Sequence, residues 1–296
     1  MHGNMRGIVL VTLSMAAFAV EDALVKLASG ALPAGQILLM IGLAGAPVFA
    51  LWGRAQGHRV WTRQALDRVL WLRNLAEVVG TLGFVTALTL IPLSSASAIL
   101  QATPIVVTAG AALFLGETVG WRRWTSVLVG FAGVLVILRP GLAGFDIHAL
   151  WAVLGVLGLA ARDLVTRRMA PGLPTMVVAT WGYVAVAALG AAMLATTGGA
   201  VVPDASGLWY VGGAVSIGIG AYWCIIEATR AGDVAAIQPF RYTRLIFAMI
   251  IGAAVFGERP DAATLTGAAL IIGSGLYAFA RERARKRGLP TAALAR

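Results

Sequence analysis

Long apolar segments recur along nearly the whole chain, and this recurrence limits the possible folds more than any other feature. A helix needs about 20 apolar residues to cross the hydrocarbon core of a bilayer. Only 12% of the residues are charged, whereas an average soluble protein has about 25%. Ten segments of suitable length are present, at 7–28, 34–52, 69–90, 95–115, 121–138, 149–165, 175–195, 208–228, 235–256 and 262–280. We therefore predict an all-α integral membrane protein with ten transmembrane helices.

The basic residues are distributed unevenly between the two ends of these predicted helices. The net charge of +10 would by itself fit a nucleic-acid-binding protein. With the N-terminus in the cytoplasm, however, almost all basic residues outside the helices lie on the cytoplasmic side, and only Arg139 and Arg259 lie opposite. Cytoplasmic loops of membrane proteins carry such an excess. We therefore expect a bacterial inner membrane protein with both termini in the cytoplasm, a longest cytoplasmic loop at 54–68, and no nucleic acid partner.

The second half of the chain repeats the first at a shift of 141 residues. The shift superposes Asp22 on Asp163, Leu32-Pro33 on Leu173-Pro174, and Gly116-Glu117 on Gly257-Glu258. Each half contains five predicted helices, and because five is odd, the second half must start on the opposite side of the membrane. Such inverted repeats recur in transporters, with the substrate site near the midplane between the halves.

The repeat sets the domain boundaries and also bears on the N-terminal segment. We expect a first five-helix unit at 1–143, a second, inverted unit at 144–283, and a basic cytoplasmic tail at 284–296. The apolar run that contains Ala17-Phe18-Ala19 imitates a signal peptide with its cleavage site. Cleavage there would remove most of a helix that belongs to the repeat, so we expect this segment to be retained.

The two Gly-Glu signals also carry a family resemblance. Each ends an apolar helix, in the runs Leu113-Phe114-Leu115-Gly116-Glu117 and Val255-Phe256-Gly257-Glu258, and Ala87-Leu88…Pro92-Leu93 precedes the fourth helix. Together these motifs resemble the EamA branch of the drug/metabolite transporter superfamily, over nearly the whole chain. The resemblance implies a secondary transporter that moves a small organic metabolite by alternating access. Solutes of the family include amino acids, vitamins such as riboflavin, and S-adenosylmethionine, and the residues do not choose among them.

Arginines near the middle of predicted helices are candidates for contact with the substrate. A charge inside a bilayer costs about 2.5–3.5 kcal/mol on insertion scales, so it needs a partner or a function. Arg241 and Arg244 are three residues apart and share one helix face, and Arg162 lies on another helix. Guanidinium groups bind carboxylates and phosphates in a bidentate manner, which favours a site for an anionic or electron-rich group. The alternative is a structural ion pair with Glu21 or Glu77.

Glu21 and Glu77 are also the candidates for coupling transport to protons. A proton-coupled carrier needs a desolvated carboxylate that can bind a proton. Both residues lie within roughly 5–7 Å of the middle of their predicted helices, near basic groups. For Glu77, an i,i+4 ion pair with Arg73 is an equal alternative.

Other carboxylates are expected to have structural roles. Two i,i+4 pairs repeat near the membrane edges, Asp22 with Lys26 and Asp163 with Arg167, and we expect each pair to be local. Glu117 and Glu258 are expected to hold the start of the helix that follows each of them, rather than to bind substrate.

Polar residues on the predicted fourth and ninth helices complete the candidate site. They are Gln101, Thr103, Gln238 and Tyr242. The family resemblance implies that both helices border a central cavity, and a proline in each frees backbone carbonyls and permits bending. Trp223 could stack on an aromatic solute, with packing as the more frequent role of such a residue.

The residue types needed for other chemistry are sparse. Cys224 is the single cysteine, and the three histidines lie at segment ends or in loops. No metal-ligand spacing or catalytic motif is recognisable, so we expect no cofactor, no metal site and no enzymatic activity. A channel, a receptor or an enzyme without a recognisable motif is the alternative function. Monomer and homodimer both remain open.

Overall fold

The computed structural model of this chain describes residues 2–61, 67–117, 120–142, 144–169, 173–231 and 237–287. The elements are α1 (His2–Ala28), α2 (Ala34–Ala55), α3 (Arg68–Leu90), α4 (Leu93–Leu100), α5 (Thr103–Phe114), α6 (Trp121–Leu138), α7 (Ala149–Thr166), α8 (Thr175–Thr197), α9 (Ala205–Ala231), the 3-10 helix η2 (Gln238–Tyr242), α11 (Thr243–Phe256) and α12 (Ala262–Arg287). No strand occurs within these ranges. Nine apolar helical spans in the described part are long enough to cross a membrane, and Trp124–Leu138 is a shorter one. The predicted all-α membrane fold is confirmed.

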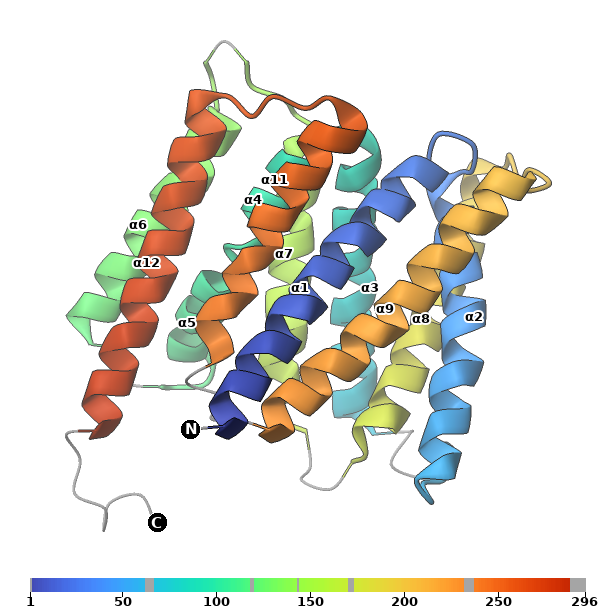
Figure 1. Cartoon of the computed structure of the whole chain (residues 1–296), viewed down its shortest axis with the longest axis horizontal. Helices are drawn as coiled ribbons and strands as arrows, with labels where there is room; N and C mark the ends of the chain where they lie inside the picture. Colours follow the sequence, from blue (N-terminus) through green and yellow to red (C-terminus); the bar gives the residue numbers. More distant parts are fainter. Residues whose placement is uncertain are drawn as a thin grey trace.

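The helices pair across the two halves of the chain. In the first half α1, α2, α3 and α6 pack against α9, α8, α7 and α12 of the second half, respectively. The first helix of one repeat thus meets the third of the other, the second meets the second, and the fifth meets the fifth. Figure 1 shows the α6–α12 pair at one edge of the bundle and the α2–α8 pair at the other. This is the pseudo-two-fold arrangement expected for inverted repeats, and it makes the boundary between the halves run through the whole bundle.

Glycines let the paired helices approach closely. A Cβ atom added to Gly155 of α7 would lie 2.9 Å from the backbone nitrogen of Phe84 in α3. A Cβ atom added to Gly267 of α12 would lie 2.5 Å from the backbone oxygen of Gly133 in α6. Small residues at helix contacts are typical of membrane proteins, in which close packing must replace the hydrophobic effect. These contacts fix the relative positions of helices that carry the charged residues of the site.

The fourth helix of each repeat is interrupted. We predicted one helix at 95–115, but α4 ends at Leu100 and α5 starts at Thr103. Proline lacks an N–H group, so Pro104 cannot donate to the carbonyl of Leu100, and the Thr103 hydroxyl donates to that oxygen instead, at 2.6 Å. In the second repeat, the corresponding segment is a 3-10 turn, Gln238–Tyr242, followed by α11. Interrupted helices at the midplane are where transporters of this architecture bind their solutes.

The fifth helices of the two repeats are joined at one end of the bundle by an ion pair between Arg139, which caps α6, and Asp261, which precedes α12. The hydrogen bond from Arg139, with further bonds from Thr264, lowers the pKa of the Asp261 carboxyl to about 2. Both side chains are partly exposed to solvent. Exposed pairs contribute about 0–1 kcal/mol, so this pair orients the helix ends more than it stabilises them.

Candidate functional site

Arg244 of α11 forms a bidentate ion pair with Asp22 of α1. Its Nη2 atom lies 2.9 Å from Oδ1 and 2.7 Å from Oδ2, and its Nε atom donates to Oδ2 at 3.1 Å. The guanidinium also lies over two rings, 5.3 Å from the centroid of Phe18 and 5.7 Å from that of Phe84. The Asp22 side chain is 7% exposed. The first helix of one repeat is thereby tied to the fourth helix of the other.

Glu77 of α3 is held by two arginines. Nη2 of Arg73 lies 2.5 Å from Oε2, and Nη1 of Arg162, on α7, lies 3.0 Å from Oε1. Arg162 also donates to its neighbour Asp163 from Nε at 3.0 Å and from Nη2 at 2.8 Å. This network crosses from one repeat to the other, as the Arg244–Asp22 pair does. Together with the Arg244–Asp22 pair, these residues form what we call the central charged cluster: Asp22, Arg73, Glu77, Arg162, Asp163 and Arg244.

Arg241 and Glu21 lie beside this cluster but are not paired. The Arg241 guanidinium makes no hydrogen bond or ion pair within the described residues, and the residue is exposed. It is nevertheless within electrostatic range of Arg162, Asp163 and Arg244. The Glu21 carboxylate, partly buried, also has no hydrogen bond or ion pair among the described groups, and it is within range of Arg244. An arginine and a glutamate, neither of them in an ion pair with another described residue, therefore flank the Arg244–Asp22 pair.

The repeat explains why Glu21 has no ion-pair partner among the described residues. Shifting by 141 residues superposes Glu21 on Arg162 and Glu77 on Gly218. Arg162 of α7 faces Glu77 of α3, whereas at the equivalent contact Glu21 of α1 faces Gly218 of α9. A Cβ atom at Gly218 would lie 2.6 Å from Oε1 of Glu21, so the carboxylate packs directly on the backbone of α9. The interface therefore has an ion pair on one side of the pseudo-two-fold axis and a single carboxylate on the other.

The polar candidates take different positions. Gln101 is buried and donates from Nε2 to the backbone oxygen of Arg241 at 3.3 Å, which links the two interrupted helices. The Thr103 hydroxyl is used in the break between α4 and α5. The Tyr242 hydroxyl packs directly against Gly275 of α12. The side chain of Gln238 lies outside the described part of the structure.

An aromatic cluster adjoins the central charged cluster. Phe49 of α2 stacks on Tyr183 of α8 with a centroid distance of 5.1 Å, and Tyr222 of α9 meets it edge-on, also at 5.1 Å. Tyr222 lies within electrostatic range of the Arg73, Glu77 and Arg162 side chains. The predicted stacking residue Trp223 is 45% exposed and has no ring partner among the described residues.

The structure corrects the predicted local pairing of Asp22 with Lys26. Asp22 binds Arg244, whereas Lys26 donates from Nζ to the carbonyl oxygens of Leu88 and Ile91 at 2.8 and 2.6 Å. The long lysine side chain reaches the free carbonyls at the end of α3, where a cation is favoured.

The predicted pairing of Asp163 with Arg167 is also wrong. Asp163 binds Arg162, and Arg167 lies 3.0 Å from Oε1 of Glu117. The i,i+4 pair of Arg73 with Glu77 is confirmed. The expected structural partners of Arg244, Glu21 or Glu77, are replaced by Asp22.

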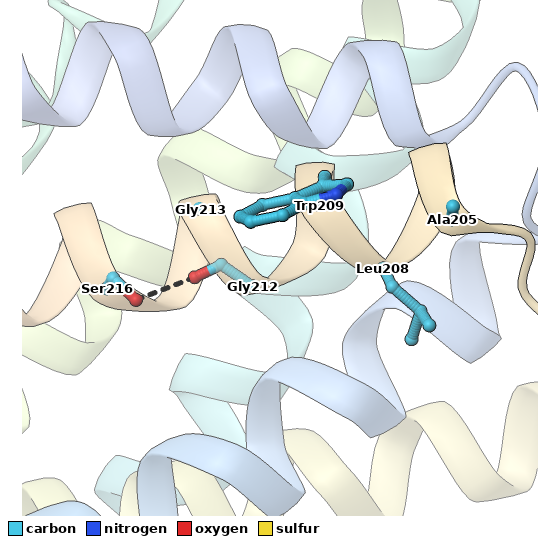
Figure 2. A pocket seen from close by; sticks show the side chains of 6 residues that line it. All are labelled: Ala205, Leu208, Trp209, Gly212, Gly213 and Ser216. Atoms are coloured by element: carbon cyan, nitrogen blue, oxygen red, sulfur yellow. Dashed lines mark hydrogen bonds between the residues drawn. The ribbon is translucent and has the colours of Figure 1, made fainter.

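A surface groove lies apart from these charges. It measures about 530 Å³ and is lined by Ala205, Leu208, Trp209, Gly212, Gly213 and Ser216 of α9. Figure 2 shows the Trp209 ring lying along this helix and the hydrogen bond from the Ser216 hydroxyl to the backbone oxygen of Gly212. Trp209 is 79% exposed, and no charged side chain lines the groove. A lipid-facing helix surface has this character.

Three features of the site were not predicted from the sequence. Phe18 and Phe84 cover the Arg244 guanidinium, and Tyr183 and Phe49 belong to one ring cluster. Contacts between residues this far apart in the chain leave no spacing signal. The repeat could have revealed the third feature, because it places Gly218 opposite Glu21.

Comparison with known proteins agrees with this arrangement. The sequence pattern described as the EamA-like transporter family matches residues 5–139 and 146–279, one match in each repeat. A solved crystal structure aligns over 94% of this chain and 98% of its own, with a TM-score of 0.62 and 21% identity. That similarity shows a shared fold.

Several curated proteins are related in sequence. A riboflavin transporter of Rhizobium johnstonii is 30% identical over 219 residues, which cover 73% of this chain and 72% of the relative. An S-adenosylmethionine uptake transporter of Rickettsia bellii is 26% identical, with 72% of each chain covered. A pseudopaline exporter of Pseudomonas aeruginosa is 28% identical over 90% of this chain and 93% of its own.

Proposed function

Since this chain belongs to the EamA-like transporter family and is a secondary transporter of a small organic metabolite, we propose that Arg241 binds an anionic or electron-rich group of the solute. The observation that carries the proposal is a guanidinium on an interrupted helix between the two halves that has no hydrogen bond or ion pair in the described part of the chain. A charged side chain in the membrane region is retained when it meets protein, water or ligand. All other arginines near the middle of the bundle already have carboxylate partners.

The remaining site candidates divide by what they contact. Gln101 positions the backbone of Arg241, and Tyr222 offers a ring beside the charged network. For Thr103, Tyr242 and Trp223, contact with the solute stays a prediction. Arg244, Glu77 and Arg162 hold the two repeats together in the present arrangement. Their ion pairs must therefore rearrange, or move as rigid units, during transport.

The relatives supply the first solutes to test. The names of these relatives point to S-adenosylmethionine, riboflavin and pseudopaline. Purified protein should be screened for ligand-dependent thermal stabilisation with these solutes and with amino acids. The stabilising solute should then enter protein-containing liposomes in a saturable manner, whereas a channel would pass it without saturation. Conversion of the solute into a product would instead support an enzyme.

We further propose that Glu21 is the group that couples transport to protons. Glu77 is engaged by two guanidinium groups, whereas Glu21 makes no bond among the described residues and is free to take up a proton. Replacing Glu21 by Gln should therefore remove most of the pH dependence of uptake, while binding at a fixed pH persists. Asp204→Asn, at the start of α9, is the matched acidic control. Unchanged pH dependence in Glu21→Gln would transfer the role to Glu77 or exclude proton coupling.

The orientation in the membrane follows from the charge bias. We propose an inner membrane location, with both termini in the cytoplasm and a basic tail at 284–296. Figure 1 shows α1 starting and α12 ending at the same end of the bundle, which supports termini on one side. A fluorescent protein fused after Arg296 should be active, and a periplasmic phosphatase fused there should be inactive. An active phosphatase fusion would reverse the assigned orientation.

A further inference from the structure

The two Gly-Glu signals end their helices in the same way. Gly116 and Gly257 have φ values of +68° and +64°, which glycine adopts without strain. The backbone N–H of Glu117 donates to Ala111, and that of Glu258 donates to Gly252, six residues back in both cases. A glycine in the left-handed conformation thus ends the helix in both repeats. The repeat thus places Glu117 and Glu258 in equivalent positions at opposite ends of the bundle.

The side chains of these two glutamates make different contacts. Glu258 accepts from the backbone N–H groups of Leu93 and Ser94 at 2.6 and 2.9 Å, and from the Ser94 hydroxyl at 2.7 Å. It therefore caps α4, a helix of the other repeat, and not α12, the helix that follows it. Glu117, which is 42% exposed, is ion-paired with Arg167. The role predicted for both glutamates, holding the start of the helix that follows each of them, is replaced by a cap on α4 for Glu258 and an ion pair with Arg167 for Glu117.

The basic partners are related by the same shift. Lys26 is equivalent to Arg167, and both lie at the end of the first helix of their repeat. Lys26 is within electrostatic range of Glu258 but is bonded to the α3 carbonyls, and its Nζ lies 5.6 Å from the Phe256 ring centroid. At one end, then, acid and base each bind the backbone of neighbouring helices, and at the other end they bind each other.

We propose that Glu258 and Lys26 form a gate that opens by exchanging these partners. In the state described by the structure, Glu258 holds the start of α4 and Lys26 holds the end of α3, which closes this end of the bundle. On opening, the two side chains release the backbone and pair with each other, as Glu117 and Arg167 do now. The exchange leaves neither charge unpaired, which lowers the barrier to moving α4. The gate rests on the assignment as a transporter but not on the identity of the solute.

The test uses a thiol reporter in the purified full chain. Ser97 of α4 is 1% exposed, and Cys224 is the single native cysteine, so a Cys224→Ser, Ser97→Cys background carries one hidden thiol. Its rate of labelling by a polar maleimide should be slow. Adding Glu258→Ala should raise that rate roughly tenfold or more, the change expected from losing at least one charge-assisted hydrogen bond. Glu258→Gln should give a smaller rise.

Two controls separate a gate from general loosening. Asp204→Asn removes a carboxylate that caps α9 within its own helix, through Gly207 and Ser206, and should leave the labelling rate unchanged. Lys26→Met removes the α3 contacts of the closed state and also the partner of Glu258 in the open state, so it should raise labelling much less than Glu258→Ala and should slow transport. Labelling unchanged by both Glu258 variants, or raised equally by Asp204→Asn or Lys26→Met, would overturn the gate. The labelling readouts need no solute, so they can fail while the proposed function stands.

Discussion

Replacing Arg244 by Gln is expected to lower the free energy of unfolding by about 3–5 kcal/mol, the usual loss when one member of a buried ion pair is removed. The Asp22 carboxyl group is almost fully buried and would stay there without its bidentate partner. The guanidinium would also leave the faces of Phe18 and Phe84. The measurement is the midpoint of thermal unfolding of the purified protein in detergent, which should fall clearly below that of the unaltered chain.

Adding Asp22→Asn to Arg244→Gln should recover most of that loss, because two amides can bond to each other and no buried charge remains. The double-mutant cycle isolates this coupling from other effects of each change. Arg259→Gln, at an exposed arginine before α12, should leave the midpoint unchanged. A normal midpoint in Arg244→Gln together with lost solute binding would instead assign Arg244 to the substrate site.

Helix order and inverted symmetry could be predicted because their signals are long and repeated. The predicted segment 149–165 became α7 (Ala149–Thr166), and 121–138 became α6 (Trp121–Leu138). The thickness of the bilayer sets the length of each segment. The Asp22/Asp163 and Gly116/Gly257 matches repeat at one spacing. These signals depend on local composition and do not require knowledge of how the helices rotate against each other.

The breaks in the fourth helices were only partly predictable. Pro104 and Pro239 indicated bending, but a proline within an apolar run fits both a kinked helix and a broken one. The outcome at Leu100 depends on the Thr103 hydroxyl, which takes the carbonyl that Pro104 leaves free. Such a repair depends on side-chain geometry, which the sequence pattern does not specify.

Ion-pair partners were the least predictable feature of the site. A helix offers Asp22 a local partner in Lys26, at the favourable i,i+4 spacing. The observed partner, Arg244, is on another helix of the other repeat, so its distance depends on packing and rotation. A bidentate guanidinium desolvated between two rings is a stronger partner than a lysine that can reach the α3 carbonyls. Only the Arg73–Glu77 pair, which also fits the tertiary arrangement, kept its local geometry.

The asymmetry between the repeats is the sequence feature that still points to Arg241. Under the shift, Arg241 corresponds to Leu100 and Arg244 corresponds to Thr103, so the symmetric fold needs no charge at either position. The structure gives Arg244 a partner and leaves Arg241 without one within the described residues. The sequence predicted one site for both arginines. Because only Arg244 has an ion-pair partner among the described residues, we now expect the two replacements to have different effects.

Arg241→Gln is expected to weaken solute binding by about a hundredfold, the equivalent of about 2–3 kcal/mol for a lost charge-assisted contact. The midpoint of thermal unfolding should not fall, because Arg241 has no ion pair with any described residue and its replacement removes a positive charge from beside Arg162 and Arg244. Arg241→Lys keeps the charge but loses the planar fork, so an intermediate loss of binding is expected. The measurement is a titration with the solute that gives the largest thermal stabilisation in the metabolite panel, using Arg259→Gln as the charge-matched control. Unchanged affinity in Arg241→Gln would remove Arg241 from the site, and a fall in the unfolding midpoint as large as that of Arg244→Gln would give Arg241 a structural role.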